Sequence, residues 1–100
     1  MTPKSEYRTS DIPNQPGVYV FRDRFREVIY VGKAKSLRRR MSAYFQPSRS
    51  RTSDIRIRSL INSICFYEIF PVRTEEEALM RESAYIKQYK PRYNVVLRDD

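Results

Sequence analysis

Two periods of apolar residues alternate along this chain, and each change of period marks a new element. Residues 17–22 and 28–32 are rich in Val, Ile, Tyr and Phe, the composition typical of strands. The charged connector 23–27 has the length of a hairpin turn, which predicts that the two strands pair antiparallel. This connector contains no glycine, so the turn type and the register remain open. A third strand is predicted over 66–72, with Pro71 favouring an edge or an exit from the sheet.

Apolar residues recur at helical spacing in three further segments. The first two are 37–45 and 54–63, each with an apolar stripe on one side, and Ser36 is a natural N-cap for the first. The third begins at Thr74 and runs to about Tyr89, and the spacing of Thr74 and Glu77 is that of a capping box. The short tail that follows this last helix is predicted to be extended.

These elements predict an α/β fold with a small, largely antiparallel three-stranded sheet flanked by helices. The chain has 100 residues, enough for one modest core. We assign residues 13–100 to a single domain and residues 1–12 to a flexible, polar N-terminal leader.

The charge balance indicates a polyanionic partner. Twenty Lys and Arg against twelve Asp and Glu give a net charge of +8. Nucleic acid is the first candidate and an anionic membrane surface the second, while solvated charge on a generic basic protein is the plain alternative. No apolar run approaches the roughly 18 residues of a membrane-spanning helix, and the first ten residues are too polar for a secretory signal.

Two residue types narrow the chemistry further. The single cysteine, Cys65, allows no intrachain disulfide, which fits a reducing cytoplasm. Histidine is absent, which excludes serine–histidine triads, histidine-based nucleases and Cys/His zinc sites. Any catalysis must therefore use Tyr, Lys, Arg, carboxylates and a hard metal ion.

Glu82 is out of place in the helical pattern. It shares a stripe with Leu79, Ile86 and Tyr89, and a carboxylate on an apolar face is costly unless it is paired or binds a metal. The alternatives are an ion pair with one of the many cations and a position at the rim of the stripe.

Four other residues invite a functional interpretation. Arg40 lies four residues before Tyr44, so both project along one side of their helix, beside its apolar face. Tyr19 and Tyr30 lie on adjacent strands, where tyrosine also serves simply to pack. In a chain without histidine, tyrosine is the best remaining candidate for a base, and a lysine just past the second strand could favour its phenolate.

The two strands carry the triplets Gly17-Val18-Tyr19 and Tyr30-Val31-Gly32, and the second runs into a basic helix. This pattern resembles the GIY-YIG nuclease superfamily and, within it, the amino-terminal domain of the UvrC family, with valine in place of isoleucine in both triplets. Residues 32–35, 37–45 and 85–95 extend the resemblance. It covers most of the chain, with order and spacing preserved.

The resemblance implies a role for each matching residue. The family's site residues fall on Tyr30 as the active-site tyrosine, Tyr19 and Tyr44 as companion tyrosines, Arg40 as the arginine, Lys33 as the lysine after the second triplet, Glu82 as the metal-binding glutamate and Asn94 as the asparagine after the helix. We expect Lys35, Arg38 and Arg39 to contact the DNA backbone without reading bases.

The implied function is that of an endodeoxyribonuclease that uses one Mg²⁺ or Mn²⁺ ion to cut one strand 3′ to a lesion in nucleotide excision repair. Tyr30 would act as general base with help from Lys33, and Arg40 would bind the scissile phosphate. We expect a cytoplasmic monomer whose partners are DNA and, in a UvrC-like system, the UvrB–DNA complex, with no membrane.

Two rival interpretations remain open. One is a catalytically silent DNA-binding or protein-docking module of the same fold. The other is a nucleophilic tyrosine that forms a covalent DNA adduct. The UvrC family continues beyond the matching region, so this chain is either an excised domain or a free-standing relative.

Overall fold

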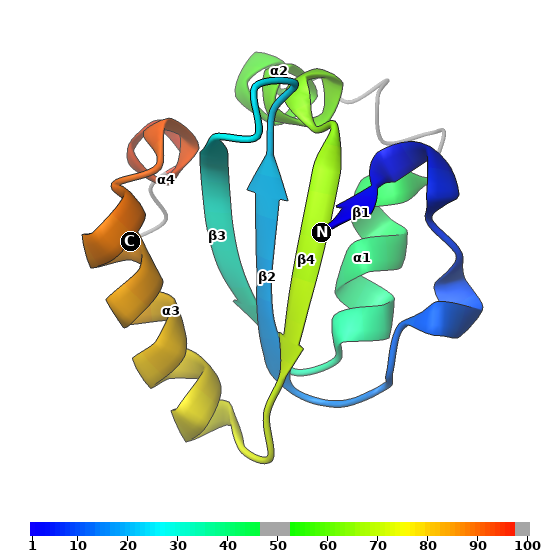
Figure 1. Cartoon of the computed structure of the whole chain (residues 1–100), viewed down its shortest axis with the longest axis vertical. Coiled ribbons are helices and arrows are strands. Elements are labelled where there is room, and N and C mark those ends of the chain that lie inside the picture. The colour runs from blue at the N-terminus through cyan, green and yellow to red at the C-terminus, as the bar shows by residue number, and fades with distance from the viewer. Residues whose placement is uncertain (47–52, 98–100) are drawn as a thin grey trace.

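An antiparallel sheet forms the centre of the molecule (Figure 1). The computed structural model describes residues 1–46 and 53–97. Within them the sheet has four strands in the order β1-β4-β2-β3. The strands are β1 (Thr2–Pro3), β2 (Gly17–Arg22), β3 (Val28–Ala34) and β4 (Phe66–Pro71). The helices are α1 (Leu37–Phe45), α2 (Ile55–Ser63), α3 (Glu75–Tyr89) and α4 (Arg92–Val96), and the short 3₁₀ turns are Lys4–Glu6 and Thr9–Asp11.

The predicted hairpin is confirmed, with one irregularity. β2 and β3 pair antiparallel, with Phe21 opposite Tyr30, and then the register shifts so that Arg22 is opposite Val28. Ile29 is therefore the extra residue of a β-bulge. Bulges re-aim side chains and are common beside active sites, and this one directly precedes Tyr30.

The turn of this hairpin contains no glycine. One carboxylate oxygen of Asp23 accepts hydrogen bonds from the backbone N–H groups of Phe25 and Glu27, at 2.9 and 3.0 Å. Arg26 adopts a left-handed conformation, with φ of 67°. A non-glycine residue in this region carries a conformational cost. Side-chain hydrogen bonding by Asp23 thus compensates for a turn that the sequence did not reveal.

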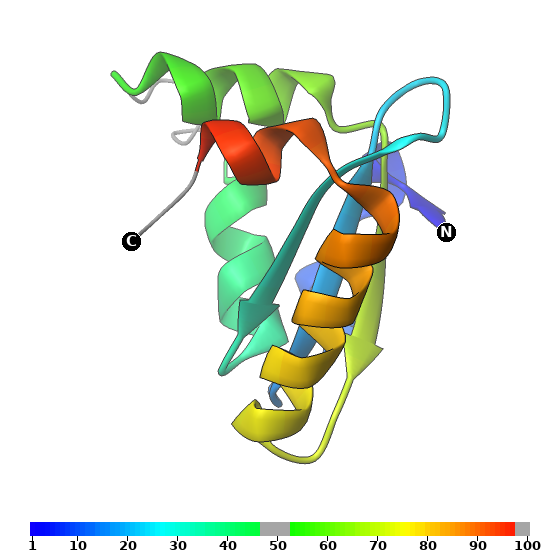
Figure 2. The same ribbon diagram turned by 90° about the vertical axis from the view of Figure 1, so that its left-hand side faces the viewer.

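The helices cover both faces of the sheet (Figure 2). α1 and α2 lie on one face, while α3 packs across β2 and β3 on the other. The predicted caps are present: Ser36 accepts a hydrogen bond from the Arg39 amide, and Thr74 accepts one from the Glu77 amide. In the described part of the chain, no helix is both long and apolar enough to cross a membrane.

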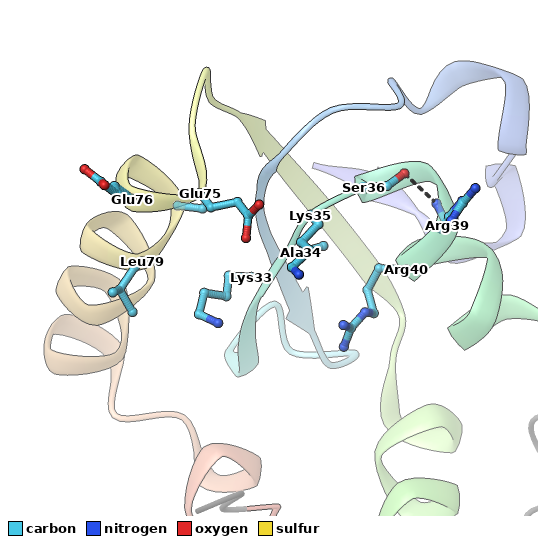
Figure 3. A pocket seen from close by; sticks show the side chains of 10 residues that line it. Lys33, Ala34, Lys35, Ser36, Arg39, Arg40, Glu75, Glu76 and Leu79 are labelled. Carbon is cyan, nitrogen blue, oxygen red and sulfur yellow. Dashed lines mark hydrogen bonds between the residues drawn. The ribbon is translucent and has the colours of Figure 1, made fainter.

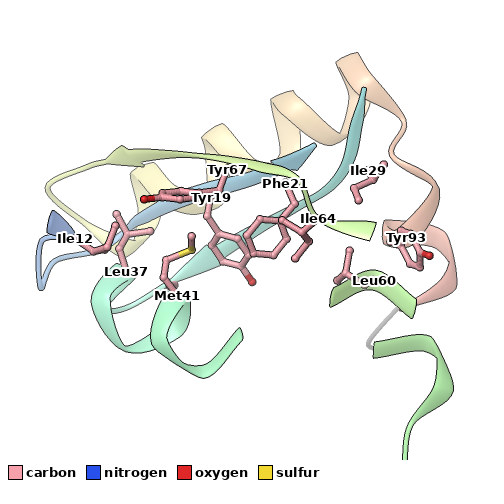
Figure 4. Packing of buried hydrophobic residues seen from close by; sticks show 11 residues of the cluster. Ile12, Tyr19, Phe21, Ile29, Leu37, Met41, Leu60, Ile64, Tyr67 and Tyr93 are labelled. Atoms are coloured by element: carbon pink, nitrogen blue, oxygen red, sulfur yellow. The ribbon is translucent and has the colours of Figure 1, made fainter. Parts of the chain in front are cut away.

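The larger core fills the space between the sheet and α1 and α2 (Figure 4). It is unusually aromatic, with Tyr19, Phe21 and Tyr67 side by side and Leu37 and Met41 of α1 against them. The smaller core on the other face is built from valines, with Val18, Val20 and Val31 packed against Ala78 of α3. The candidate site residues on β2 and β3 therefore rest on a fully packed platform.

Two predictions about the chain ends were wrong. Residues 1–12 are not a separate leader: β1 pairs with β4 as a fourth strand, Lys4 Nζ donates to the carbonyl of Ile61 at 2.9 Å, and Ile12 is 2% exposed. Met1, Tyr7 and Ile12 are scattered among polar residues, and this pattern was too weak to predict it. The segment after Pro91 is helical, because α4 is a helix of five residues, too short for its periodicity to be recognised.

Candidate active site

The glycine of one triplet accommodates the tyrosine of the other. Tyr19 on β2 is directly opposite Gly32 on β3. A Cβ atom at Gly32 would overlap the Cζ and hydroxyl of Tyr19, so the ring lies where only glycine leaves room. Gly17 is equally constrained, since a Cβ there would meet a Leu37 methyl at 2.5 Å and the Phe70 carbonyl oxygen at 2.7 Å. Both triplets are thus packing devices as well as candidate chemistry.

Three tyrosines converge from two strands and a helix. The Tyr19 hydroxyl donates to the Tyr44 hydroxyl at 3.4 Å. The ring centroids of Tyr19, Tyr30 and Tyr44 lie 5.6 to 6.5 Å from one another. Phe21 supports all three, with ring centroids 5.0 to 6.2 Å from theirs. The structure therefore brings together the three tyrosines that the sequence singled out.

Burial holds the hydroxyls of Tyr19 and Tyr30 in their neutral form. Desolvation is the largest cause that raises the pKa of Tyr30 above its ordinary value, and the neighbouring Tyr44 and Glu82 raise it further. Burial also raises the pKa of Tyr19, while Arg40 acts in the opposite direction. Burial outweighs any help that Lys33 gives to the Tyr30 phenolate in the metal-free protein, because the pKa of Tyr30 rises; the role expected for Lys33 stays a prediction.

Lys33 interacts with Glu82. Burial raises the pKa of Glu82, while the charge of Lys33 and a hydrogen bond from the Lys33 backbone amide lower it. No ion pair within 4 Å involves Glu82 among the described residues. This carboxylate is therefore partly desolvated and incompletely neutralised.

The reason given for singling out Glu82 was only partly right. The stripe that it shares on α3 is not a buried face, since Leu79 is 51% exposed and Tyr89 is 39% exposed. The helix is buried through Ala78 and packs through Tyr85 and Ile86. Glu82 thus sits at the rim of the helix–sheet contact, half-buried and near Tyr30.

Next to this rim, a basic cleft of about 520 Å³ separates the start of α3 from the β3–α1 connection (Figure 3). Its lining includes Lys33, Lys35, Ser36, Arg39 and Arg40 on one side and Glu75, Glu76, Ala78 and Leu79 on the other. Glu75 is directed across the cleft and Glu76 away from it. Arg40 links the cleft to the tyrosines, because its charge acts on Tyr19. Ser36 and Glu75 were not predicted to line this cleft, because strand and helix patterns do not reveal which helix start faces which loop.

Asn94 lies at the edge of β3, where it replaces a neighbouring strand. Its side-chain amide accepts from the N–H of Val31 at 2.9 Å and donates to the carbonyl of Val31 at 2.8 Å. Since Val31 follows Tyr30, these two bonds fix the strand at the point from which the tyrosine projects.

Arg38 lies apart from the other predicted residues. Its Nε donates to the carbonyl of Ile12 at 2.7 Å, and its side chain does not line the cleft. The first amides of α1 are also occupied, with Leu37 donating to Gln15 and Arg38 to Pro13. An anion in the cleft must therefore be bound by side chains rather than by the N-terminus of α1.

The available protein ligands suit an ion such as Mg²⁺ that keeps several of its waters, rather than an ion enclosed entirely by protein ligands. No group of three or more His, Cys, Asp or Glu side chains that could hold a metal occurs in residues 1–46 and 53–97. Mg²⁺ keeps several waters and is commonly bound through one or two carboxylates plus substrate phosphate. A single half-buried carboxylate such as Glu82 fits that pattern; it does not line the basic cleft itself, but it interacts with Lys33, which does.

Comparisons with known proteins agree with this geometry. A family model described as a UvrC-like GIY-YIG domain matches residues 15–95. The UvrABC system protein C of Pseudoalteromonas atlantica is 49% identical over 90 residues, which is 90% of this chain and 14% of that protein. That of Clostridioides difficile is 46% identical over 89 residues, again 14% of its length. The chain thus spans about a seventh of these curated relatives.

A solved structure extends the similarity to three dimensions. The GIY-YIG N-terminal endonuclease domain of UvrC from Thermotoga maritima, bound to magnesium as its catalytic divalent cation, superposes with a TM-score of 0.75. The identity is 32%, and the match covers 94% of this chain and 99% of that one. A tyrosine-to-phenylalanine point mutant of the same domain, also bound to the cation, matches with a TM-score of 0.75 and 30% identity.

Proposed function

The chain belongs to the UvrC-like GIY-YIG domain family, and from this premise we propose that it is a divalent-metal-dependent endonuclease domain that hydrolyses a phosphodiester bond in DNA. The proposal rests on one observation: a carboxylate, a cluster of tyrosines and an arginine lie together at one edge of the sheet. Glu82 acts electrostatically on Tyr30, and Arg40 acts on Tyr19 within the same tyrosine cluster.

Each side chain has a task that its surroundings support. Arg40 and Lys33, at the cleft, bind the scissile phosphate and offset the charge that builds up on it. In the small fraction of molecules in which Tyr30 is a phenolate, its oxygen takes a proton from the attacking water and becomes a neutral hydroxyl, and Tyr19 and Tyr44 orient that oxygen through the cluster. Asn94 keeps β3 in place through Val31.

Glu82 is the proposed ligand for one Mg²⁺ or Mn²⁺ ion. When bound, the ion supplies positive charge close to the leaving oxygen of the phosphate. The protein's own contribution is to hold the carboxylate partly desolvated beside the positive charge of Lys33.

DNA backbone contacts come from the basic side chains around the cleft. Lys35 and Arg39 line it directly, and Arg38 is an exposed neighbour on the same helix. These residues offer charge without an ordered set of base-reading side chains, so we expect weak sequence preference and a steep salt dependence.

The wider biological role is a proposal from the relatives. Since they are UvrABC system proteins, we propose incision 3′ to a lesion in nucleotide excision repair, with a UvrB–DNA complex as the partner. We further propose a monomer acting in the cytoplasm, which accords with the single unpaired Cys65.

Nicking of supercoiled plasmid with Mn²⁺ or Mg²⁺, with and without EDTA, tests the proposal. We expect nicking that requires the ion, is lost in Glu82→Gln and is slowed in Arg40→Ala. Retained DNA binding with no nicking under any metal condition, with or without purified UvrB, would favour the silent module. DNA that stays linked to protein after denaturation would favour a nucleophilic tyrosine.

A further inference from the structure

The tip of the β2–β3 hairpin carries an exposed aromatic ring between two arginines. Phe25 is 70% exposed and lies between Arg24 and Arg26 in the sequence. It contributes nothing to either core.

The tip holds this ring in a fixed position. Asp23 is 7% exposed, and its carboxylate is occupied by the backbone amides of Phe25 and Glu27. The backbone adds bonds from the Asp23 amide to the Glu27 carbonyl at 3.0 Å and from the Arg26 amide to the Asp23 carbonyl at 2.9 Å. A ring presented on an ordered turn loses little conformational entropy on binding.

Arginines stacked on aromatic rings gather at this end of the molecule. In the described residues, four such pairs have the guanidinium carbon 4.7 to 5.9 Å from a ring centroid. They are Arg22 with Tyr89, Arg24 with Phe25, Arg26 with Phe66, and Arg92 with Tyr93. Stacking orders a guanidinium without using its N–H groups. Those of Arg22 are already taken up by Glu68 and the carbonyl of Arg26.

A recess of about 440 Å³ adjoins the ring. Arg24, Phe25 and Arg92 line it together with the carboxylates of Asp23 and Glu27, with Cys65, and with the polar side chains of Asn62 and Ser63 from the end of α2. The contact of Arg92 with Asp23 is long, at 3.8 Å, so its charge is only partly offset. The recess therefore combines an aromatic surface, cations and hydrogen-bonding groups, which is the combination that binds unpaired nucleotides.

The tip is on the same hairpin as Tyr30. Tyr30 is five positions after Phe25, so their Cα atoms are at most about 17 Å apart at a strand's rise per residue. Successive phosphates of one DNA strand are about 3.4 Å apart along the axis. The ring thus lies within about five nucleotides of a phosphate at Tyr30.

We propose that Phe25 stacks on an unpaired base close to the scissile bond, with Arg24, Arg26 and Arg92 on the flanking phosphates. The inference deepens the proposed function, on which it rests for DNA as the substrate, and it names a substrate class: duplex with a few unpaired nucleotides. A protein partner at the tip is the competing occupant. The shared hairpin with Tyr30 and the cluster of stacked arginines favour nucleic acid.

Binding measurements in EDTA test this without incision. Two DNAs of equal length would be compared, one fully paired and one with three unpaired nucleotides, the middle one being the fluorescent base 2-aminopurine. The variants are Phe25→Ala, Phe25→Leu and Phe25→Trp. Ile55→Ala is the matched control, since Ile55 is 69% exposed. None of these substitutions removes a core contact, so all should fold.

We expect Phe25→Ala and Phe25→Leu to weaken binding of the unpaired DNA by about 5- to 150-fold, the range of a lost base–aromatic stack. Binding of the paired DNA should change less than about twofold, and wild type and Phe25→Trp should both quench 2-aminopurine. An unchanged affinity in Phe25→Ala, as a protein-docking tip predicts, would overturn the inference, and so would an equal loss on both DNAs.

The nicking assay separates this inference from the proposed function. If the protein never nicks DNA but its binding of unpaired DNA depends on Phe25, the inferred contact stands and the proposed nuclease activity is wrong. If the protein nicks with Mn²⁺ but Phe25→Ala binds unpaired DNA as the wild type does, the proposed nuclease activity stands and the inferred contact is wrong.

Discussion

Asn94 forms two hydrogen bonds with the backbone of Val31, one as donor and one as acceptor, at 2.8 and 2.9 Å. An edge strand normally leaves its backbone amides and carbonyls unpaired. Here a side chain from α4 pairs with both the N–H and the carbonyl of Val31. Because Val31 lies between Tyr30 and Gly32, the helix after α3 controls the position of the candidate base.

Asn94→Ala should therefore affect both stability and incision. Losing both bonds should cost about 1–3 kcal/mol of the free energy of unfolding, or roughly 4–20 °C in melting temperature for a domain of this size. Asn94→Asp keeps the acceptor for the Val31 amide and should lie between the two. Calorimetry and plasmid nicking would measure the effects. An Asn94→Ala protein with unchanged melting and unchanged nicking would show that α4 does not support the site.

Gly32→Ala should destabilise the domain, although alanine is usually better than glycine in a strand. The new Cβ would overlap the Tyr19 ring, and forced overpacking typically costs about 1–3 kcal/mol. The cause can be isolated with Tyr19→Leu, which removes the overlapping atoms. Tyr19→Leu should cost less in the Gly32→Ala background than in the wild type, with a coupling of at least about 0.5 kcal/mol. Strictly additive effects in denaturant unfolding would refute the contact.

Glu82→Gln should abolish the thermal stabilisation by Mg²⁺ or Mn²⁺ and abolish nicking, while the fold survives. The raised pKa of Glu82 means that the folded state holds its proton at a pH where the unfolded state has lost it. Stability then falls as pH rises through that acidic window, and Glu82→Gln should lose this part of the pH dependence. Melting curves across acidic pH, with and without metal, give both readouts. Full metal stabilisation of the folded variant would end the assignment of Glu82 as ligand.

Lys33→Met should act through Glu82. Lys33 lowers the pKa of Glu82, so its removal should raise that pKa further, measurable by NMR titration of the metal-free protein. The acidic limb of the nicking profile should shift to higher pH in parallel, while the alkaline limb should stay in place. A shift of the alkaline limb alone would instead support the expectation that Lys33 acts on Tyr30. Lys35→Met, also at the cleft but not among the causes of the Glu82 pKa, is the matched control.

Local patterns predicted much of the fold. Strand composition and the length of the 23–27 connector fixed the hairpin, and Ser36 and Thr74 marked the starts of two helices that begin where expected. The bulge at Ile29 and the turn built on Asp23 were beyond reach, because both depend on cross-strand register and on a side chain replacing the usual glycine. The strand at Thr2–Pro3 was missed because two residues cannot show a period.

The site was predicted unevenly for a related reason. Motif resemblance identified the tyrosines, and the structure brings them together. The resemblance says nothing, however, about the charges and burial around each residue. Lys33 was therefore paired with Tyr30 only because the two are close in sequence. In three dimensions α3 brings Glu82 to Lys33, and burial rather than charge determines the protonation of Tyr30.

That protonation leads to the most direct test of the mechanism. Since burial raises the pKa of Tyr30, its hydroxyl is neutral at pH 7, and the small phenolate fraction grows tenfold for each pH unit below that pKa. The nicking rate should therefore climb from pH 7 to about pH 9.5 without a plateau, if the ordinary tyrosine pKa is near 10 and the folded value is higher. Initial rates on supercoiled plasmid at fixed ionic strength would measure this.

Tyr30→Phe removes only the hydroxyl, so the ring contacts with Phe21 and Tyr44 should survive while the rate falls about 10²- to 10⁴-fold, the usual contribution of a general base. The residual rate should lose its climb with pH. Arg40→Ala is the contrasting variant, because a residue that binds phosphate should lower the rate at every pH and leave the slope intact. A Tyr30→Phe protein that nicks at the wild-type rate with an unchanged slope would mean that Tyr30 only packs, and the base would then have to be sought at Tyr19 or Tyr44. Tyr44 would be tested first, because Tyr19 is fully buried and an inaccessible hydroxyl cannot meet the attacking water.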